Sequence, residues 1–152
     1  MRPRIYTDTS VLGGCEDDEF RDQSRRLIQA FVRGDLLLVL SELALRELAA
    51  APDSVRRILG TIPGEHIESL GLSRDAEELA RSYVLEGAIG ERMRADALHI
   101  ALATVARVDV LVSWNFKHIV NLRRIHAFNA VNLKMGYPIL EIRTPREISK
   151  DD

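Results

Sequence analysis

The sequence predicts an α/β protein in which helices cover both faces of a mostly parallel sheet. Three observations support this class. Short apolar strand-like segments alternate with amphipathic helical segments along the 152 residues. The segment 35–41, DLLLVLS, is apolar almost throughout, which is typical of a parallel strand buried on both faces. The segment 97–106, ALHIALATVA, has no charged residue, as expected of a buried helix.

Local signals mark the ends of several expected elements. Gly34 is suited to end the first long helix, Ser41 and Ser73 to cap later helices, and Pro52 to stop the helix that follows Ser41. The expected strands are 5–7, 35–41, 66–70, 109–113 and 138–144. The expected helices are 22–33, 42–51, 54–59, 74–87, 91–108 and 119–133. No repeat or Gly/Ser-rich linker interrupts this order, so residues 1–152 are expected to form a single domain.

Composition limits the classes of partner. The formal net charge is −2, so the chain has no overall basic character, and a nucleic acid would have to be held by a local patch or a metal site. The one cysteine, Cys15, excludes an internal disulfide and suits a reducing compartment. No apolar signal region or run of transmembrane length is present in the sequence. We therefore expect a cytoplasmic protein with no membrane partner.

Asp8 directly follows the first expected strand. In parallel sheets, functional sites form outside the carboxyl ends of the strands, which makes this acid a candidate site residue. Its type and position suit a turn residue or a helix N-cap equally well. Thr9 and Ser10 follow it and could orient its carboxylate or donate a hydrogen bond to a phosphate.

Two further acids point toward apolar neighbours on separate expected helices. Glu47 shares a helix face with Ala44, where an unpaired charge is unfavourable. Asp96 lies on the same face as Ile100, at the margin of the uncharged segment. A structural ion pair with a neighbouring arginine, Arg92 or Arg94, would explain Asp96 equally well.

Taken together, the acids predict a metal site. At about 4 Å and an effective dielectric constant near 20, each like-charge pair would be unfavourable by about 4 kcal/mol, so such a cluster needs a proton or a cation. Carboxylate oxygens suit Mg²⁺ or Mn²⁺, which can activate water for in-line attack on a phosphate. The sequence lacks the GxxxxGK[ST], GxGxxG and HExxH motifs of other phosphate and metal sites. Phosphodiester chemistry is the activity that these residues favour.

Four segments, in this order, resemble the PIN-domain family and most closely its stand-alone VapC-type toxins. They are IYTDTSVL, LSELALREL, RADALHIALA and VLVSWNFKHI. The resemblance implies a three-layer α/β/α PIN-like sandwich and a Mg²⁺- or Mn²⁺-dependent endoribonuclease. It also implies a homodimer, and the toxin of a type II toxin–antitoxin pair that an antitoxin protein inhibits.

The resemblance also implies roles for individual residues. Asp8, Glu47 and Asp96 match the acids of the first three motifs, and Asn115 occupies a position where many members have a fourth acid. Asp8 and Asp96 would ligate the metal, and Glu47 would bind metal or orient the attacking water. The remaining expected site residues are Ser10 and Asn115, which would complete the metal surroundings, and Lys117, which could contact the RNA backbone.

The residues near Asn115 leave alternatives open. Trp114 and Phe116 could stack on a base, although packing beneath the end of the sheet is the expected role for at least one of them. Because Asn115 leaves the acid set one charge short, the main alternative function is a PIN-fold RNA- or protein-binding module with weak or absent catalysis. A small-molecule phosphatase is disfavoured because the sequence contains no nucleophile motif.

Overall fold

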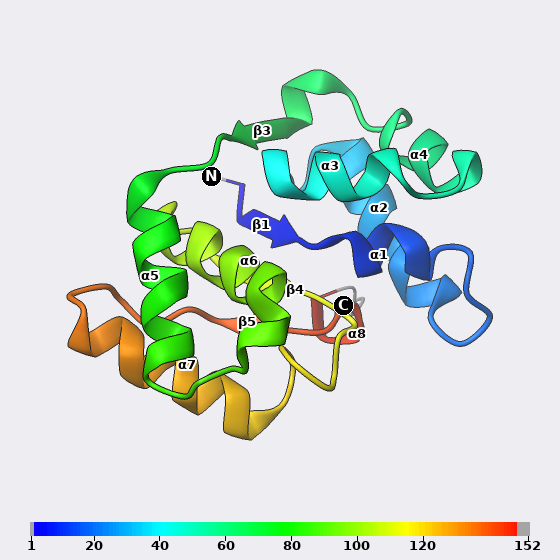
Figure 1. The fold of residues 1–152 in the computed structure, drawn as a ribbon. Coiled ribbons are helices and arrows are strands. Elements are labelled where there is room, and N and C mark those ends of the chain that lie inside the picture. Colours follow the sequence, from blue (N-terminus) through cyan, green and yellow to red (C-terminus); the bar gives the residue numbers. More distant parts are fainter. Residues whose placement is uncertain (1, 149–152) are drawn as a thin grey trace.

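A five-stranded parallel sheet forms the centre of the computed structural model, which describes residues 2–148 (Figure 1). Its strands are β1 (Arg4–Thr7), β2 (Leu37–Ser41), β3 (Ile67–Leu70), β4 (Val110–Val112) and β5 (Ile142–Arg143). In space the order is β3-β2-β1-β4-β5, and every adjacent pair is parallel. The chain thus builds outward from β1 to β3 and then returns to the other side of β1. This reversal between β1 and β4 is the point at which open parallel sheets form binding crevices.

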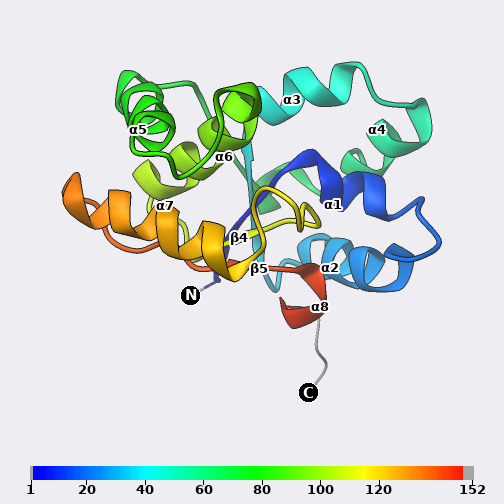
Figure 2. The same cartoon turned by 60° about the horizontal axis from the view of Figure 1, so that its bottom comes forward.

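Helices cover both faces of the sheet, which confirms the predicted three-layer arrangement (Figures 1 and 2). One apolar core lies against α5 (Arg74–Leu85), α6 (Arg94–Val105) and α7 (Leu122–Lys134). The other lies against α1 (Thr9–Gly14), α2 (Arg21–Arg33), α3 (Glu42–Ala49) and α4 (Asp53–Leu59). Neighbouring residues of β1 enter opposite cores, Ile5 the second and Tyr6 the first, because side chains alternate along a strand. No helix within residues 2–148 is long and apolar enough to cross a membrane.

The expected capping residues act as predicted. Ser41 Oγ accepts a hydrogen bond from the Ala44 N–H at 3.1 Å, and Ser73 Oγ accepts one from the Ala76 N–H at 3.1 Å. Gly34 follows α2 with φ of 84°, a left-handed conformation that glycine adopts without steric penalty. These ends could be predicted because each depends on a residue next to the helix that it terminates.

Other boundaries differ from the prediction. The helix expected over 91–108 is shorter, since Glu91–Met93 form a 3-10 turn and Arg107 leaves the helical region with φ of 56°. Helix α7 begins at Leu122 rather than at 119, because the Asn121 side chain caps it by accepting from the Arg124 N–H. Strand β5 has two residues where 138–144 was expected, and the short helices α1 and α8 (Pro145–Ile148) were not predicted.

Candidate active site

Asp8 lies at the carboxyl end of β1, next to the end of β4. Thr7 pairs with Val112 in the sheet, so the residues that follow them, Asp8 and Ser113, lie side by side. Ser113 Oγ donates to Asp8 Oδ2 at 2.7 Å, while Ser10 donates to Asp8 Oδ1 from its hydroxyl at 2.5 Å and from its backbone N–H at 3.2 Å. The last bond makes Asp8 the N-cap of α1, so the cap interpretation is confirmed, and Ser10 orients the carboxylate as expected.

The Asp8 carboxylate is held in a buried position. Only 6% of the residue is exposed, and this burial raises the pKa of Asp8. The hydrogen bonds from Ser10 and Ser113 and the nearby His99 act in the opposite direction but do not outweigh burial. The ionised form of Asp8 is therefore less stable here than in water, and a nearby positive charge would stabilise it.

Glu47 extends from α3 and is partly buried. Its Oε1 atom accepts a hydrogen bond from His99 Nε2 at 2.9 Å and a longer one from Thr9 Oγ1 at 3.3 Å. Burial acts to raise the pKa of Glu47, but the hydrogen bond and Coulombic attraction from His99, together with the hydrogen bond from Thr9, outweigh it, and the pKa is lowered. Glu47 thus lies in surroundings that favour the carboxylate form.

Asp96 lies in the first turn of α6 and is also partly buried. Burial raises its pKa, and the negative charge of Asp8 raises it further, with a smaller effect from Glu47. The predicted acids therefore interact electrostatically across three elements of the fold. The alternative ion pair is not observed: within the described part of the chain Asp96 has no salt bridge, and Arg94 instead approaches Glu91 at 3.7 Å.

The chemistry of these donors fits a hard divalent cation. Asp8 and Asp96 are both disfavoured as free anions, and carboxylate oxygens are the ligands that Mg²⁺ and Mn²⁺ prefer. Across residues 2–148, however, no three His, Cys, Asp or Glu side chains have converged closely enough to enclose a metal ion. The three acids interact electrostatically, but in the described residues they do not enclose a metal-binding cavity. Metal binding therefore stays a prediction.

Asn115 follows β4 and holds the loop in which it lies. Its Oδ1 atom accepts from the His118 N–H at 2.9 Å, and its own backbone N–H donates to Ser113 Oγ at 2.9 Å. One lone pair of the side-chain carbonyl is thereby used within the turn. The Nδ2 amide has no hydrogen-bond partner among the described residues and is the part of Asn115 that can still donate to a phosphate or a water.

The aromatic residues on either side of Asn115 have different surroundings. Trp114 is 5% exposed, stacks on Phe20 with ring centroids 4.1 Å apart, and donates from Nε1 to Ser24 Oγ at 2.8 Å. This confirms that packing is the role of one of the two aromatics. Phe116 is 47% exposed and remains available for stacking, and Lys117 is exposed with no ion pair within residues 2–148.

Sequence reasoning missed three residues of the site. Ser113 contacts Asp8 directly, and the only sequence signal for it is a hydroxyl residue immediately after a predicted strand. His99 lies in the segment 97–106, which the sequence predicts to be buried; it is buried, and its hydrogen bond reaches Glu47. His118 acts to lower the pKa of Asp96, and its buried Nδ1 atom has no partner in the described part of the chain.

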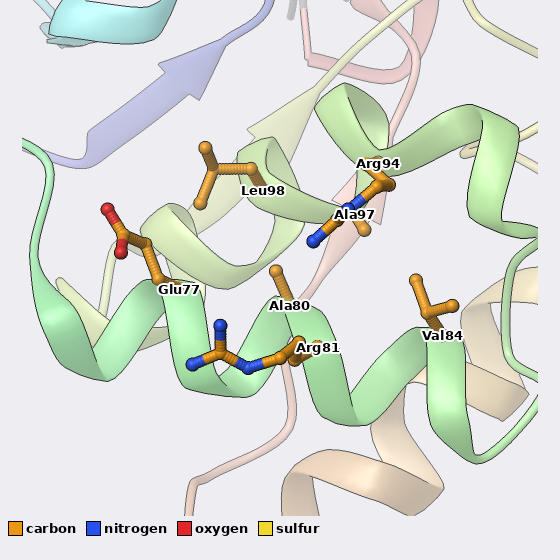
Figure 3. A pocket seen from close by; sticks show the side chains of 7 residues that line it. All are labelled: Glu77, Ala80, Arg81, Val84, Arg94, Ala97 and Leu98. Atoms are coloured by element: carbon orange, nitrogen blue, oxygen red, sulfur yellow. The ribbon is translucent and has the colours of Figure 1, made fainter.

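A separate groove of about 220 Å³ lies between α5 and α6 (Figure 3). Arg81 and Arg94 extend along it, with Glu77 near one end (Figure 3). Its apolar walls are formed by Ala80, Val84, Ala97 and Leu98. None of the predicted catalytic residues lines this groove, so it is distinct from the acidic site.

The fold resembles those of several solved structures, although no protein-family model and no curated protein matches the sequence. VapC20 from Mycobacterium tuberculosis, described as a sarcin–ricin loop cleaving toxin, superposes with a TM-score of 0.58 at 15% identity, over 75% of this chain and 92% of that one. A toxin–antitoxin complex from Klebsiella pneumoniae gives a TM-score of 0.57 at 17% identity, over 79% and 93%. VapBC2 from Rickettsia felis, solved with a DNA fragment from its promoter, gives 0.57 at 14% identity, over 93% and 98%. The chain therefore has the PIN-domain fold of VapC-type toxins, as its four sequence motifs indicate.

Proposed function

We propose that this protein is a Mg²⁺- or Mn²⁺-dependent endoribonuclease and the toxin of a type II toxin–antitoxin pair. The observation that carries the proposal is the electrostatic coupling of Asp8, at the carboxyl end of β1 beside β4, with Glu47 and Asp96. Asp8 and Asp96, which are disfavoured as free anions, and Glu47, which is held as a carboxylate, together form the kind of acid set that a cation-assisted phosphodiester hydrolysis requires. The fold shared with VapC20, which is described as a sarcin–ricin loop cleaving toxin, supports the substrate class.

The surroundings of each acid suggest its role in the proposed reaction. Asp8 and Asp96 would hold the metal, and Ser10 and Ser113 fix the orientation of Asp8. When bound, the metal supplies charge stabilisation of the phosphate and a more acidic water. Glu47, held in its carboxylate form, would orient the attacking water or accept its proton.

Contacts to the RNA would come from residues around the acids and from the separate α5–α6 groove. The Nδ2 amide of Asn115 would donate to a phosphate oxygen, and Lys117 would contact the backbone. Arg81 and Arg94 in the α5–α6 groove would supply the local positive charge that the overall charge of −2 does not. Exposed Phe116 would stack on a base.

The partners proposed are an antitoxin protein and a second copy of the chain. One fold neighbour is a toxin–antitoxin complex, and another is VapBC2 bound to promoter DNA. A cytoplasmic location agrees with the single buried cysteine, which needs no oxidising compartment.

The test is cleavage of a labelled RNA by purified protein with Mg²⁺, with Mn²⁺ and with EDTA. We expect cleavage only with a divalent cation, and a loss of roughly 100-fold or more in Asp8→Asn and Asp96→Asn, as is common when acid–base or charge stabilisation is removed. Asp75→Asn is the matched control, because Asp75 is an exposed acid in the first turn of α5. Equal cleavage by the wild type and Asp96→Asn would reject the proposal.

The alternative of an RNA-binding module is favoured by one observation: the Asn115 carbonyl accepts a hydrogen bond within its loop, and Asn115 brings no negative charge in place of the missing acid. RNA binding by the wild type and Asp96→Asn with equal affinity, and no cleavage by either, would support this alternative.

A further inference from the structure

The acidic site is connected to a buried chain of polar groups that includes no other predicted site residue. His99 on α6 is 2% exposed, and Tyr6 on β1 and Ser41 at the end of β2 are each 0% exposed. The Tyr6 hydroxyl lies 2.6 Å from His99 Nδ1 and 2.8 Å from Ser41 Oγ, within hydrogen-bonding distance of both. His99 Nε2 lies 2.9 Å from Glu47 Oε1. The chain therefore runs from the core beneath the sheet to a carboxylate in the site.

The direction of the last bond follows from its partners. A carboxylate oxygen can only accept, so the 2.9 Å contact requires that the Nε2 atom of His99 carries a hydrogen and donates it. The bond to Tyr6 at Nδ1 fixes the imidazole ring from the other side. Hydrogen bonds at both nitrogens hold the imidazole ring in one orientation. The Nε2 donor then has a fixed position, and this fixes the orientation of the Glu47 carboxylate that accepts from it.

The two carboxylate oxygens of Glu47 differ in their hydrogen bonds. Both side-chain donors, His99 and Thr9, bond Oε1. No hydrogen bond from the described part of the chain falls on Oε2. One oxygen is thus tied to the protein, and the other is left for a ligand.

Packing alone does not account for this arrangement. Buried polar groups are unfavourable unless every one is bonded, and an apolar side chain in place of His99 would fill the core without that requirement. The hydroxyl of Tyr6 would then need no hydrogen-bond partner other than Ser41. What the polar chain adds is a fixed hydrogen-bond donor at Glu47.

We propose that His99 is a positioning residue: through Nε2 it holds Glu47 Oε1 so that Oε2 faces the ligand shared by Asp8 and Asp96, with Tyr6 and Ser41 holding His99. This assignment rests on the proposed nuclease function. It predicts that changes at His99 affect the turnover of bound RNA rather than the binding of RNA.

The first experiment compares two replacements of His99. His99→Gln retains an amide donor at the position of Nε2, whereas His99→Leu fills similar space without a donor. We expect His99→Leu to lower kcat by roughly 10- to 100-fold with KM changed less than threefold, because misplacing a reacting group is costly in rate. His99→Gln should recover kcat to within roughly fivefold of the wild type, and kcat for Tyr6→Phe should fall between the two. Equal kcat for the Leu and Gln variants would overturn the proposal.

Tyr83→Phe is the matched control for the loss of a buried hydroxyl. Tyr83 is 0% exposed like Tyr6, but its hydroxyl bonds Asn132 and lies near Thr104, away from the acids. We expect Tyr6→Phe and Tyr83→Phe to lower the Tm by similar amounts, and only Tyr6→Phe to lower kcat. If Tyr6→Phe and Tyr83→Phe had equal effects on kcat, the buried polar groups would act on turnover through protein stability alone, and the proposal would be overturned.

A second measurement, on metal-free protein without RNA, separates this proposal from the nuclease function. In ¹⁵N–¹H NMR of the histidine ring, His99 should show an Nε2-bound hydrogen whose resonance shifts in Glu47→Gln and not in Asp75→Asn. If the resonance shifts but wild-type protein cleaves no RNA, the nuclease function fails while the positioning of Glu47 by His99 stands. If the resonance does not respond to Glu47→Gln, the positioning role is rejected, whether or not RNA is cleaved.

Discussion

Replacing Asp96 with asparagine is expected to stabilise the metal-free protein while abolishing RNA cleavage. Asp96 is partly buried, and its pKa is raised by burial and by the charge of Asp8. Its carboxylate makes no hydrogen bond or ion pair with the other described residues. Asp96→Asn therefore removes an unfavourable charge and keeps the shape of the side chain, without breaking a contact that the structure shows.

The magnitude follows from the two causes of the raised pKa. A like-charge pair in a partly buried site is unfavourable by on the order of 1–4 kcal/mol, and partial solvent exposure of Asp96 places it near the lower end. We expect the free energy of unfolding to rise by about 1–2 kcal/mol near neutral pH. For a chain of this size the Tm should rise by about 3–6 °C.

The effect should depend on pH in one direction. Because the pKa of Asp96 is higher in the folded state than the unfolded value of about 3.8, the folded state binds the proton more tightly between those two pKa values. The stability of the wild type therefore falls as the pH rises through this window. The difference between wild type and Asp96→Asn should be absent below the unfolded pKa and complete above the folded pKa.

The assay is thermal unfolding in EDTA from about pH 4 to pH 8, with Asp75→Asn as the control variant. Asp75→Asn is expected to leave the Tm within about 1 °C of the wild type, as for most surface substitutions. A lower Tm for Asp96→Asn at neutral pH would refute the reasoning, because it would mean that the carboxylate makes a stabilising contact. So would a Tm difference that does not change with pH.

Three further outcomes are expected. Ser113→Ala removes the donor to Asp8 Oδ2 and leaves the Asn115 N–H without its partner. Unfolding experiments should therefore show that the free energy of unfolding falls by about 2 kcal/mol, and RNA cleavage should fall as well. An unchanged Tm would contradict this. Charge reversal of both Arg81 and Arg94 should weaken RNA binding and reduce its dependence on salt concentration, measured by fluorescence anisotropy from about 50 to 200 mM salt. An unchanged affinity would show that the groove does not contact the RNA. Cys15 is 1% exposed and burial raises its pKa to about 11, so the native protein should react with a thiol reagent at pH 8 only as fast as it unfolds; rapid reaction would disprove its burial.

The fold class and many helix ends could be predicted from the sequence because their signals are local. Gly34, Ser41 and Ser73 each act on the helix beside them, and the apolar segment 35–41 needs no distant partner to indicate a buried strand. Short elements such as α1 and β5 carry too few residues for a periodic pattern. Their ends depend on neighbours that the linear sequence does not identify.

The acids of the site were recognisable because each is a charged residue in an apolar setting, and their number and positions match a known set of motifs. That pattern indicates which residues are unusual, but it does not indicate what they contact. Within the described chain, the Asp96 ion pair that the sequence left open is absent, and the carbonyl of Asn115, which was expected to complete the metal surroundings, accepts a hydrogen bond within its own loop.

The sequence by itself determined the α/β class, the buried strands and the three acids, since these depend on residue type and on spacing within single elements. Only the tertiary structure decided how the acids are held. The Ser113–Asp8 bond spans 105 residues and the His99–Glu47 bond spans 52. Contacts of that separation are set by strand order and helix packing, because parallel pairing of β1 with β4 and the placement of α3 and α6 at the same end of the sheet bring these side chains within hydrogen-bonding distance.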